Sequence, residues 1–131
     1  MKALKTEIKT LDRLKKRSDF LYVQHNGVKW VPKGFIVQLA TREVSEKAPK
    51  TGLRYGLTVT KRVSKLAVVR NRIKRRLKAV ACDVLPNYSD NNIDIVLIGR
   101  TTTLEKDYET LKNDLIWSLK RLDIKINAKK P

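Results

Sequence analysis

Residues 54–84 read RYGLTVTKRVSKLAVVRNRIKRRLKAVACDV and contain the two elements that decide the fold. Residues 54–60 alternate between two kinds of side chain, which predicts a strand with one buried and one open face. The buried face consists of Tyr55, Leu57 and Val59, and the small, polar face consists of Gly56, Thr58 and Thr60. Apolar residues then recur at helical spacing over residues 67–84, just ahead of Pro86. The stretch therefore predicts a strand followed by an amphipathic helix that packs on the same sheet.

The predicted helix over residues 67–84 is basic on the side away from its apolar stripe. The stripe consists of Val69, Ile73, Leu77, Val80 and Val84; the outward side consists of Asn71, Lys74, Arg75 and Lys78, with Arg70 and Arg76 at the flanks. Twelve Lys and Arg and no acid lie between Glu46 and Asp83, so the i,i+4 ion pairs of an ordinary solvated helix face are missing. This pattern favours a phosphate backbone as partner, ahead of a solvated face or a nuclear-import signal.

Segments on both sides of this stretch predict the remaining strands and a first helix. The helix is predicted from Ser18, as its N-cap, to Gly27. Strands are predicted over residues 28–31, 34–40 and 93–98, the last of them buried. The predicted connections are residues 43–53 and 87–92.

A last helix is predicted from a capping box formed by Thr102 and Glu105. Its apolar stripe consists of Leu104, Tyr108, Leu111, Leu115, Leu119 and Leu122, and Trp117 lies off this stripe. The order α-β-β-β-α-β-α predicts an α+β fold with one mixed sheet and helices packed mainly on one face. We expect a single domain over residues 11–124, with a flexible basic N-terminus at 1–10 and a flexible tail at 125–131.

The composition indicates a protein that binds a polyanion in a reducing compartment. The formal net charge of the 131 residues is +17, and a polyanionic partner relieves such self-repulsion. Cys82 is the only cysteine, which excludes an internal disulfide. No apolar run has the length of a membrane span, and the N-terminus has no apolar signal core. A cytoplasmic location is expected, and the basic helix lacks the aromatic face of a membrane-surface helix.

Residue types that carry out catalysis in proteins are sparse. The chain has one histidine, His25, and one cysteine, and its thirteen acids show no paired arrangement. No catalytic residue and no metal site are therefore predicted. Phe20 and Tyr22 directly follow the basic residues 13–17, which suits stacking on unpaired bases. A contact of Phe20 with the core suits the same position equally well, so both interpretations stay open.

Two segments resemble the signature of the bacterial ribonuclease P protein subunit. The first is Arg54-x-Gly56-x-x-Val59-Thr60-Lys61-Arg62. The second, AVVRNRIKRR at residues 67–76, contains the Arg-Asn-Arg element that marks the family. Residues 14–20 (LKKRSDF) and 94–100 (DIVLIGR) also match, so the resemblance covers nearly the whole chain.

The resemblance implies a partner of a large catalytic RNA that removes the 5′ leader from precursor tRNA. It implies a left-handed βαβ crossover, and a cleft for the single-stranded leader between the first helix and the open sheet face. Residues implied to contact the catalytic RNA are Arg70, Asn71, Arg72, Lys74, Arg75, Arg76 and Lys78. Residues implied to form the leader cleft are Arg17, Phe20, Gln24, Thr58, Thr60, Lys61, Arg62 and Arg100.

The resemblance also implies that the chemistry belongs to the RNA. The protein alone would bind no cofactor, Mg²⁺ would be held with the RNA, and the protein would lower the divalent-cation requirement. Neither a membrane nor an obligate protein partner is implied. Two departures from the family pattern are Gln24, where a second aromatic is common, and residues 63–66, a turn one residue longer. Alternatives are a structural RNA-binding protein such as a ribosomal component, a protein-only nuclease and a membrane-surface protein.

Overall fold

The structure is a computed structural model that describes residues 12–14, 16–41, 53–88 and 93–122. The flexible ends predicted at 1–10 and 125–131, and most of the predicted connection at 43–53, lie outside these residues. Within the described residues, no helix combines the length and apolar character that a membrane span requires.

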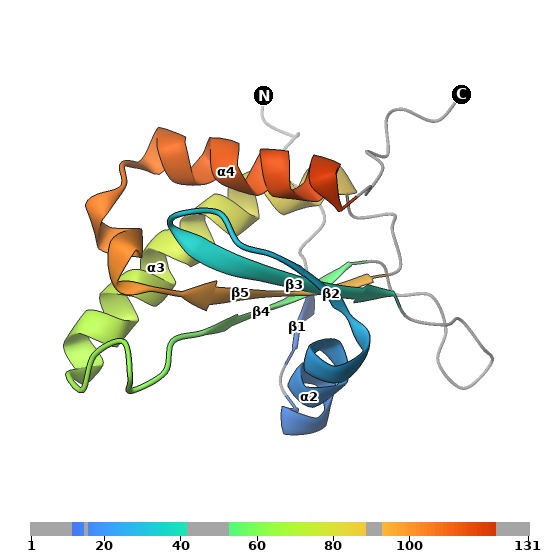
Figure 1. The fold of residues 1–131 in the computed structure, drawn as a ribbon, viewed down its shortest axis with the longest axis horizontal. Helices are drawn as coiled ribbons and strands as arrows, with labels where there is room; N and C mark the ends of the chain where they lie inside the picture. Colours follow the sequence, from blue (N-terminus) through green and yellow to red (C-terminus); the bar gives the residue numbers. More distant parts are fainter. Residues whose placement is uncertain (1–11, 15, 42–52, 89–92, 123–131) are drawn as a thin grey trace, which may run out of the picture.

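A five-stranded mixed sheet forms the middle layer of the fold (Figure 1). Its strands are β1 (Asp12–Arg13), β2 (Val28–Trp30), β3 (Phe35–Thr41), β4 (Arg54–Thr58) and β5 (Ile93–Gly99), in the order β1-β4-β5-β3-β2. β4 runs parallel to β1 and β5, whereas β3 is antiparallel to β5 and β2. The mixed sheet and the element order are confirmed. The two-residue β1 was not predicted, because it is too short to show a period.

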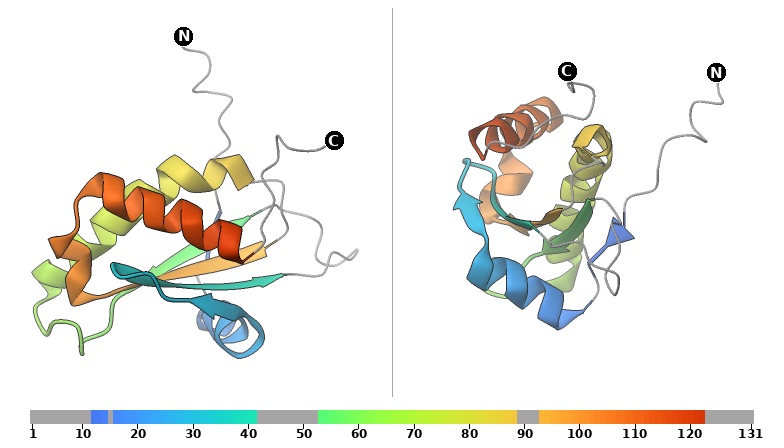
Figure 2. Two further views of the ribbon diagram at one scale, coloured as in Figure 1. Left: turned by 45° about the horizontal axis from the view of Figure 1, so that its top comes forward. Right: turned by 90° about the vertical axis from the view of Figure 1, so that its right-hand side faces the viewer.

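Helices cover both faces of the sheet (Figure 2). They are α2 (Arg17–Asn26), α3 (Ala67–Val84) and α4 (Tyr108–Arg121), with 3-10 turns η1 (Leu85–Tyr88) and η2 (Thr101–Glu105). α3 and α4 pack together on one face of the sheet, in agreement with the prediction that the helices lie mainly on one face. α2 lies alone on the other face. This solitary position of α2 leaves part of its face of the sheet uncovered.

Alternating side chains of β3 divide the interior into a large and a small core. Phe35, Val37 and Leu39 join the large core beneath α3 and α4. Ala40 belongs to the small core beneath α2, with Leu14, Val23 and Val96. The predicted stripe of α3 is confirmed: its members are buried in the large core, with Val69 half-buried at the edge.

β4, α3 and β5 form the predicted βαβ crossover, because β4 and β5 are parallel neighbours joined through α3. The left-handed sense of this crossover remains a prediction from the family resemblance. Since both strands run in one direction, the residues that follow β4 and those that follow β5 come out at the same end of the sheet.

The predicted N-cap of the first helix, Ser18, is wrong by two residues. α2 begins at Arg17 with Lys16 as N-cap, and no side chain caps it. The N–H of Leu14 donates to the carbonyl of Tyr55 over 2.8 Å, which holds the chain on the sheet just before the helix. The N–H of Asp19 then closes the first turn on the carbonyl of Lys16 at 3.0 Å, so Ser18 lies within the turn.

The predicted capping box at the start of the last helix is also wrong. Thr102 donates its hydroxyl to the carbonyl of Lys33 over 2.6 Å, and the adjacent Thr103 donates to Gly34 over 2.6 Å. These bonds hold residues 101–105 as a separate 3-10 turn. α4 begins only at Tyr108, where Asp107 is the N-cap and accepts from the N–H of Thr110 at 2.9 Å.

Candidate nucleic-acid interface

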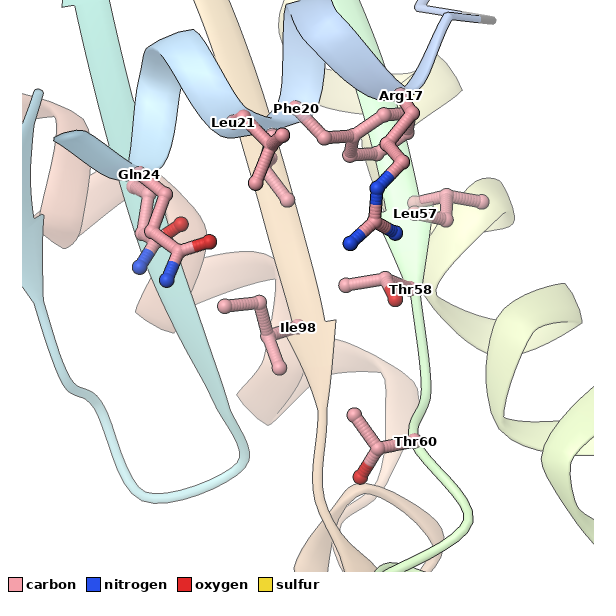
Figure 3. Close-up of a pocket in the computed structure, with 10 residues that line it drawn as sticks. Arg17, Phe20, Leu21, Gln24, Leu57, Thr58, Thr60 and Ile98 are labelled. Atoms are coloured by element: carbon pink, nitrogen blue, oxygen red, sulfur yellow. The ribbon is translucent and has the colours of Figure 1, made fainter. Parts of the chain in front are cut away.

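A cleft of about 620 Å³ lies between α2 and the uncovered face of the sheet (Figure 3). Its lining residues come from α2 (Arg17, Phe20, Leu21, Gln24), β3 (Gln38), β4 and the residues after it (Leu57, Thr58, Thr60), and β5 (Val96, Ile98). Five of the eight residues predicted for the leader cleft thus lie together: Arg17, Phe20, Gln24, Thr58 and Thr60. Figure 3 shows the α2 side chains projecting toward the sheet, with the two threonines opposite.

Phe20 serves both the core and the cleft. A Cβ atom placed on Gly56 would lie 2.6 Å from Cε1 and 2.7 Å from Cζ of the Phe20 ring, so the ring rests directly on the glycine backbone. The ring also packs against the small core and lines the cleft. The core-contact interpretation is therefore confirmed. The ring remains half-buried, which leaves part of it open to the cleft.

The three other cations predicted for the cleft lie beyond its lining. Lys61 and Arg62 are exposed in the turn that the N–H of Val63 closes on the carbonyl of Thr60 at 3.0 Å. Arg100 is half-buried directly after β5. Because β4 and β5 are parallel, these cations gather at the end of the cleft marked by Thr60 in Figure 3.

The basic side of α3 is a separate surface on the opposite side of the sheet from α2. Asn71, Arg72, Arg75 and Lys78 are exposed, whereas Arg70, Lys74 and Arg76 are half-buried. The Nη1 atom of Arg70 donates to the carbonyl of Ser64 at 2.8 Å, and the Nη2 atom of Arg76 donates to that of Lys106 at 2.5 Å. Arg70 thereby holds the turn before α3, and Arg76 holds the turn before α4.

The single acid of α3 does not offset this positive surface. The hydroxyl of Tyr108 donates to Asp83 Oδ2 at 2.7 Å, and Lys112 Nζ lies 3.3 Å from the same oxygen. The hydrogen bond from Tyr108 lowers the pKa of Asp83, and the smaller contribution of Lys112 acts in the same direction. Loss of hydration and the bond to Asp83 raise the pKa of Tyr108 to about 12. This cluster ties α4 to the end of α3.

A buried ion pair was missed by the sequence interpretation. Asp94 is 1% exposed, and its two carboxylate oxygens accept from Nε and Nη2 of Arg54 at 2.8 and 2.7 Å. Arg54 also lies 3.7 Å from Asp19 on α2. One of the twelve cations between Glu46 and Asp83 is therefore neutralised inside the molecule. In the sequence, the single acid within the apolar segment 93–98 could have indicated a buried ion pair.

A cation between two tryptophans was missed as well. The guanidinium carbon of Arg121 lies 5.2 Å from the ring centroid of Trp30 and 5.6 Å from that of Trp117. Trp117 is 54% exposed, as its position off the apolar stripe suggests. The contact joins the end of α4 to the edge strand β2, a pairing that no local pattern could predict.

The described residues contain no group of three His, Cys, Asp or Glu placed to hold a metal ion. His25 is exposed and hydrogen-bonds through its ring to the carbonyl of Leu21 at 3.1 Å. Cys82 is exposed, with its sulfur 3.9 Å from the hydroxyl oxygen of Tyr55. Arg17 is the only charged residue that lines the cleft among the residues the structure describes.

Known proteins resemble the chain over most of its length. Residues 8–123 match the family described as Ribonuclease P. The ribonuclease P protein component of Paramagnetospirillum magneticum is 43% identical over 112 residues, covering 86% of this chain and 83% of that protein. The RNase P protein of Thermotoga maritima matches with a TM-score of 0.67 at 25% identity, covering 84% of this chain and 96% of that one. The protein from Staphylococcus aureus shares the fold with a TM-score of 0.68 at 23% identity, over 88% and 98% of the two chains.

Proposed function

The chain belongs to the ribonuclease P protein family, and on this basis we propose that it holds the catalytic RNA on α3 and the 5′ leader of precursor tRNA in the cleft. As the protein component, it is part of an endoribonuclease complex that processes tRNA. The observation that carries the proposal is the presence of two different surfaces on opposite sides of one sheet. One is a convex helix rich in exposed cations, and the other is a concave cleft with an aromatic ring.

The α3 surface suits a folded RNA. Arg72 and Arg75 are exposed, and a guanidinium binds phosphate through two parallel hydrogen bonds. Together with the neighbouring cations, contacts to about six phosphates would give a slope near −5 in a log–log plot of affinity against salt. Such a surface recognises the charge and shape of an RNA backbone, and proteins recognise duplex RNA mostly through these features.

The cleft suits an unpaired strand. Phe20 offers part of a ring for stacking, and the hydroxyls of Thr58 and Thr60 offer hydrogen bonds along the opposite wall. Arg17, which lies beside Phe20 in Figure 3, and the exposed Lys61 and Arg62 supply positive charge for the backbone. A ribosomal type of RNA-binding protein would need the α3 surface alone, so the cleft favours the two-partner proposal.

The chain would act by electrostatics and positioning. Two RNAs repel each other, and cations on both sides of one small domain lower that repulsion and the need for divalent ions. The bond-breaking step, with its Mg²⁺, would belong to the RNA. The protein's own contribution is to hold the leader so that the cleavage site meets the RNA catalytic centre.

Reconstitution tests the proposal. The purified chain is mixed with a ribonuclease P RNA and precursor tRNA at limiting Mg²⁺, and leader removal is measured. We expect stimulation that disappears when Mg²⁺ is abundant. A chain that neither stimulates cleavage nor binds the RNA would contradict the proposal.

Phe20→Ala tests the role of the cleft separately from that of the α3 surface. The variant should weaken binding of precursor tRNA to the reconstituted complex about tenfold, because stacking of one base contributes about 1–3 kcal/mol. Binding of mature tRNA, which has no leader, should be unchanged. Equal losses for both tRNAs would exclude a leader contact at Phe20.

A further inference from the structure

Both tryptophans of the chain lie around one arginine at the end of α4. The guanidinium carbon of Arg121 is 5.2 Å from the ring centroid of Trp30 and 5.6 Å from that of Trp117. We call these three residues the tryptophan site. Trp117 is 54% exposed, although burial of an indole ring is among the largest apolar gains that a side chain makes on folding. A ring that only fastened α4 to β2 would be better buried, so the open surface of Trp117 is available for a ligand.

Arg121 keeps its hydrogen-bonding edge free. A guanidinium that lies over aromatic rings presents its flat faces to them, so its N–H groups remain available in the plane of the group. Arg121 is exposed, and within the described residues it makes no hydrogen bond and no ion pair. Asp114, about two turns earlier on the same side of α4, interacts electrostatically with Lys106 and Lys33 instead. The two rings therefore hold in place a cation that has no partner of opposite charge in the described part of the chain.

The tryptophan site lies on the same face of the sheet as the basic surface of α3. Trp30 pairs with Val37, whose side chain belongs to the large core beneath α3 and α4, so Trp30 stands on that face. The hydroxyl of Tyr108 contacts Asp83 of α3, and Trp117 follows Tyr108 by about two and a half turns, which places it on the side of α4 away from α3. A helix with its side chains is about 10–12 Å wide. An RNA bound on α3 thus reaches the site by crossing α4 alone.

Building on the proposed function, we propose that the tryptophan site binds one unpaired nucleotide of the catalytic RNA, with its base stacked on Trp117 and its phosphate bound by Arg121. Every base has a face that stacks on an aromatic ring, and a guanidinium matches the geometry of a phosphate. The nucleotide must be unpaired, because the bases of a duplex are stacked on one another and only splayed-out bases reach an aromatic side chain.

The catalytic RNA is the source of this nucleotide because of where the site lies. The site adjoins the α3 surface, whereas the cleft proposed for the leader lies under α2 on the other face of the sheet (Figure 2). Contacts to phosphates alone let a protein slide along a nucleic acid. One stacked nucleotide beside the α3 surface would fix the position and orientation of the domain on the RNA.

Tryptophan fluorescence tests the stacking directly, because the chain has no tryptophan outside this site. Trp30→Phe leaves Trp117 as the only emitter. Titration of this variant with the catalytic RNA should remove most of its fluorescence, since a base stacked on an indole quenches its emission, and the wild type should be quenched in part. A fully paired RNA duplex should bind through charge and leave the emission unchanged. Quenching that begins only when precursor tRNA is added to the preformed complex would overturn the assignment to the catalytic RNA.

Affinity measurements separate the ring from the charge. Trp117→Leu keeps an apolar side chain without an aromatic face, and should weaken catalytic RNA binding about tenfold with an unchanged salt slope. Trp117→Phe should retain most of the affinity. Arg121→Gln should reduce the magnitude of the salt slope by about 1, whereas the adjacent exposed Lys120→Gln, the matched control, should keep it. Urea unfolding verifies that each variant is folded. Equal affinities of the Leu and Phe variants would contradict stacking on Trp117.

The failure of this inference is distinct from failure of the proposed function. Filter retention reports binding of the catalytic RNA without using fluorescence. If wild type and Trp30→Phe are both retained and neither loses emission, no nucleotide stacks at the site and the inference is refuted, while the proposed function stands. If the wild type is not retained by the catalytic RNA at all, the proposed function itself is refuted.

Discussion

Gly56 determines where the ring of Phe20 lies. With no Cβ, the glycine lets the ring approach the sheet, whereas a methyl group there would meet Cε1 at 2.6 Å. Leu14 approaches the same position, with Cδ1 at 3.2 Å. The ring is at the edge of the small core and half-buried, so it can move out toward the cleft.

Gly56→Ala should therefore displace Phe20 and impair the cleft while the fold persists. We expect weaker binding of precursor tRNA to the reconstituted complex, by about 1 kcal/mol, the smaller end of a stacking contribution. Binding of the catalytic RNA should be unchanged, since α3 lies on the other side of the sheet. Unaltered precursor binding would show that the ring position does not matter for the leader.

Arg54 neutralises a carboxylate that has almost no access to water. Arg54→Ala would leave Asp94 buried without its main partner, and breaking such a pair typically costs about 3–5 kcal/mol. Because Arg54 is itself partly exposed, with 25% of its side chain accessible, we expect about 3 kcal/mol, measured as the free energy of urea unfolding.

A double-mutant cycle with Asp94→Ala isolates the pair. The double variant should lose less stability than the sum of the two single losses, because each single change removes the same interaction. Additive losses would mean that the two side chains act independently.

At the scale of elements, α4 depends on its N-cap. Hydrogen bonds from Thr110, first from its side chain and then from its N–H, lower the pKa of Asp107 below its ordinary value of 3.8. A carboxylate whose pKa is lower in the folded state stabilises the fold above the unfolded value, and this stabilisation disappears as the pH falls through the folded value.

Asp107→Asn tests this link, because asparagine also caps helices and does not titrate. The variant should match the wild type in urea-unfolding midpoint near neutral pH. From about pH 4 downward the wild type should lose stability more steeply than the variant, at constant ionic strength. Asp83 remains in both proteins and contributes the same acid-dependent loss to each. Parallel pH profiles would show that the Asp107 charge has no stabilising role.

At the scale of the whole molecule, the sheet separates two positively charged surfaces. A net charge of +17 on 131 residues is distributed so that α3 presents one surface and the ends of the cleft another. Arg54 and the half-buried Arg76 are partly committed to internal contacts. The exposed Arg72 and Arg75 should therefore account for more of the binding to the catalytic RNA than their neighbours.

Arg72→Gln/Arg75→Gln should reduce the magnitude of the salt slope for catalytic RNA binding by about 2, or about 1 for each phosphate that is no longer bound. The ratio of affinities for precursor and mature tRNA should stay as in the wild type. Lys120→Gln removes an exposed charge from α4 and is the matched control. An identical slope for the double variant and the control would contradict a specific role for the α3 surface.

The sequence by itself determined most of the elements and the charged outer side of α3. Periodicity and the absence of acids are properties of neighbouring residues, so the strand at 54–58, the helix at 67–84 and its outward cations were predictable. Five cleft residues came with the family resemblance. Only the tertiary structure decided where α4 begins, because Thr102 and Thr103 bond carbonyls 69 residues away.

The tertiary structure also decided which distant side chains lie next to one another. Arg54 meets Asp94 across 40 residues only because β4 and β5 pair in parallel. Gln38 lines the same hollow as Gln24 and Lys29 because β3 lies beneath α2 and pairs with β2. Hydrogen bonds and ion pairs act over a few ångströms, and which distant side chains come that close is a property of the packed sheet. Local patterns determined what each segment is, and the packing of the sheet and helices decided which partner each side chain finds.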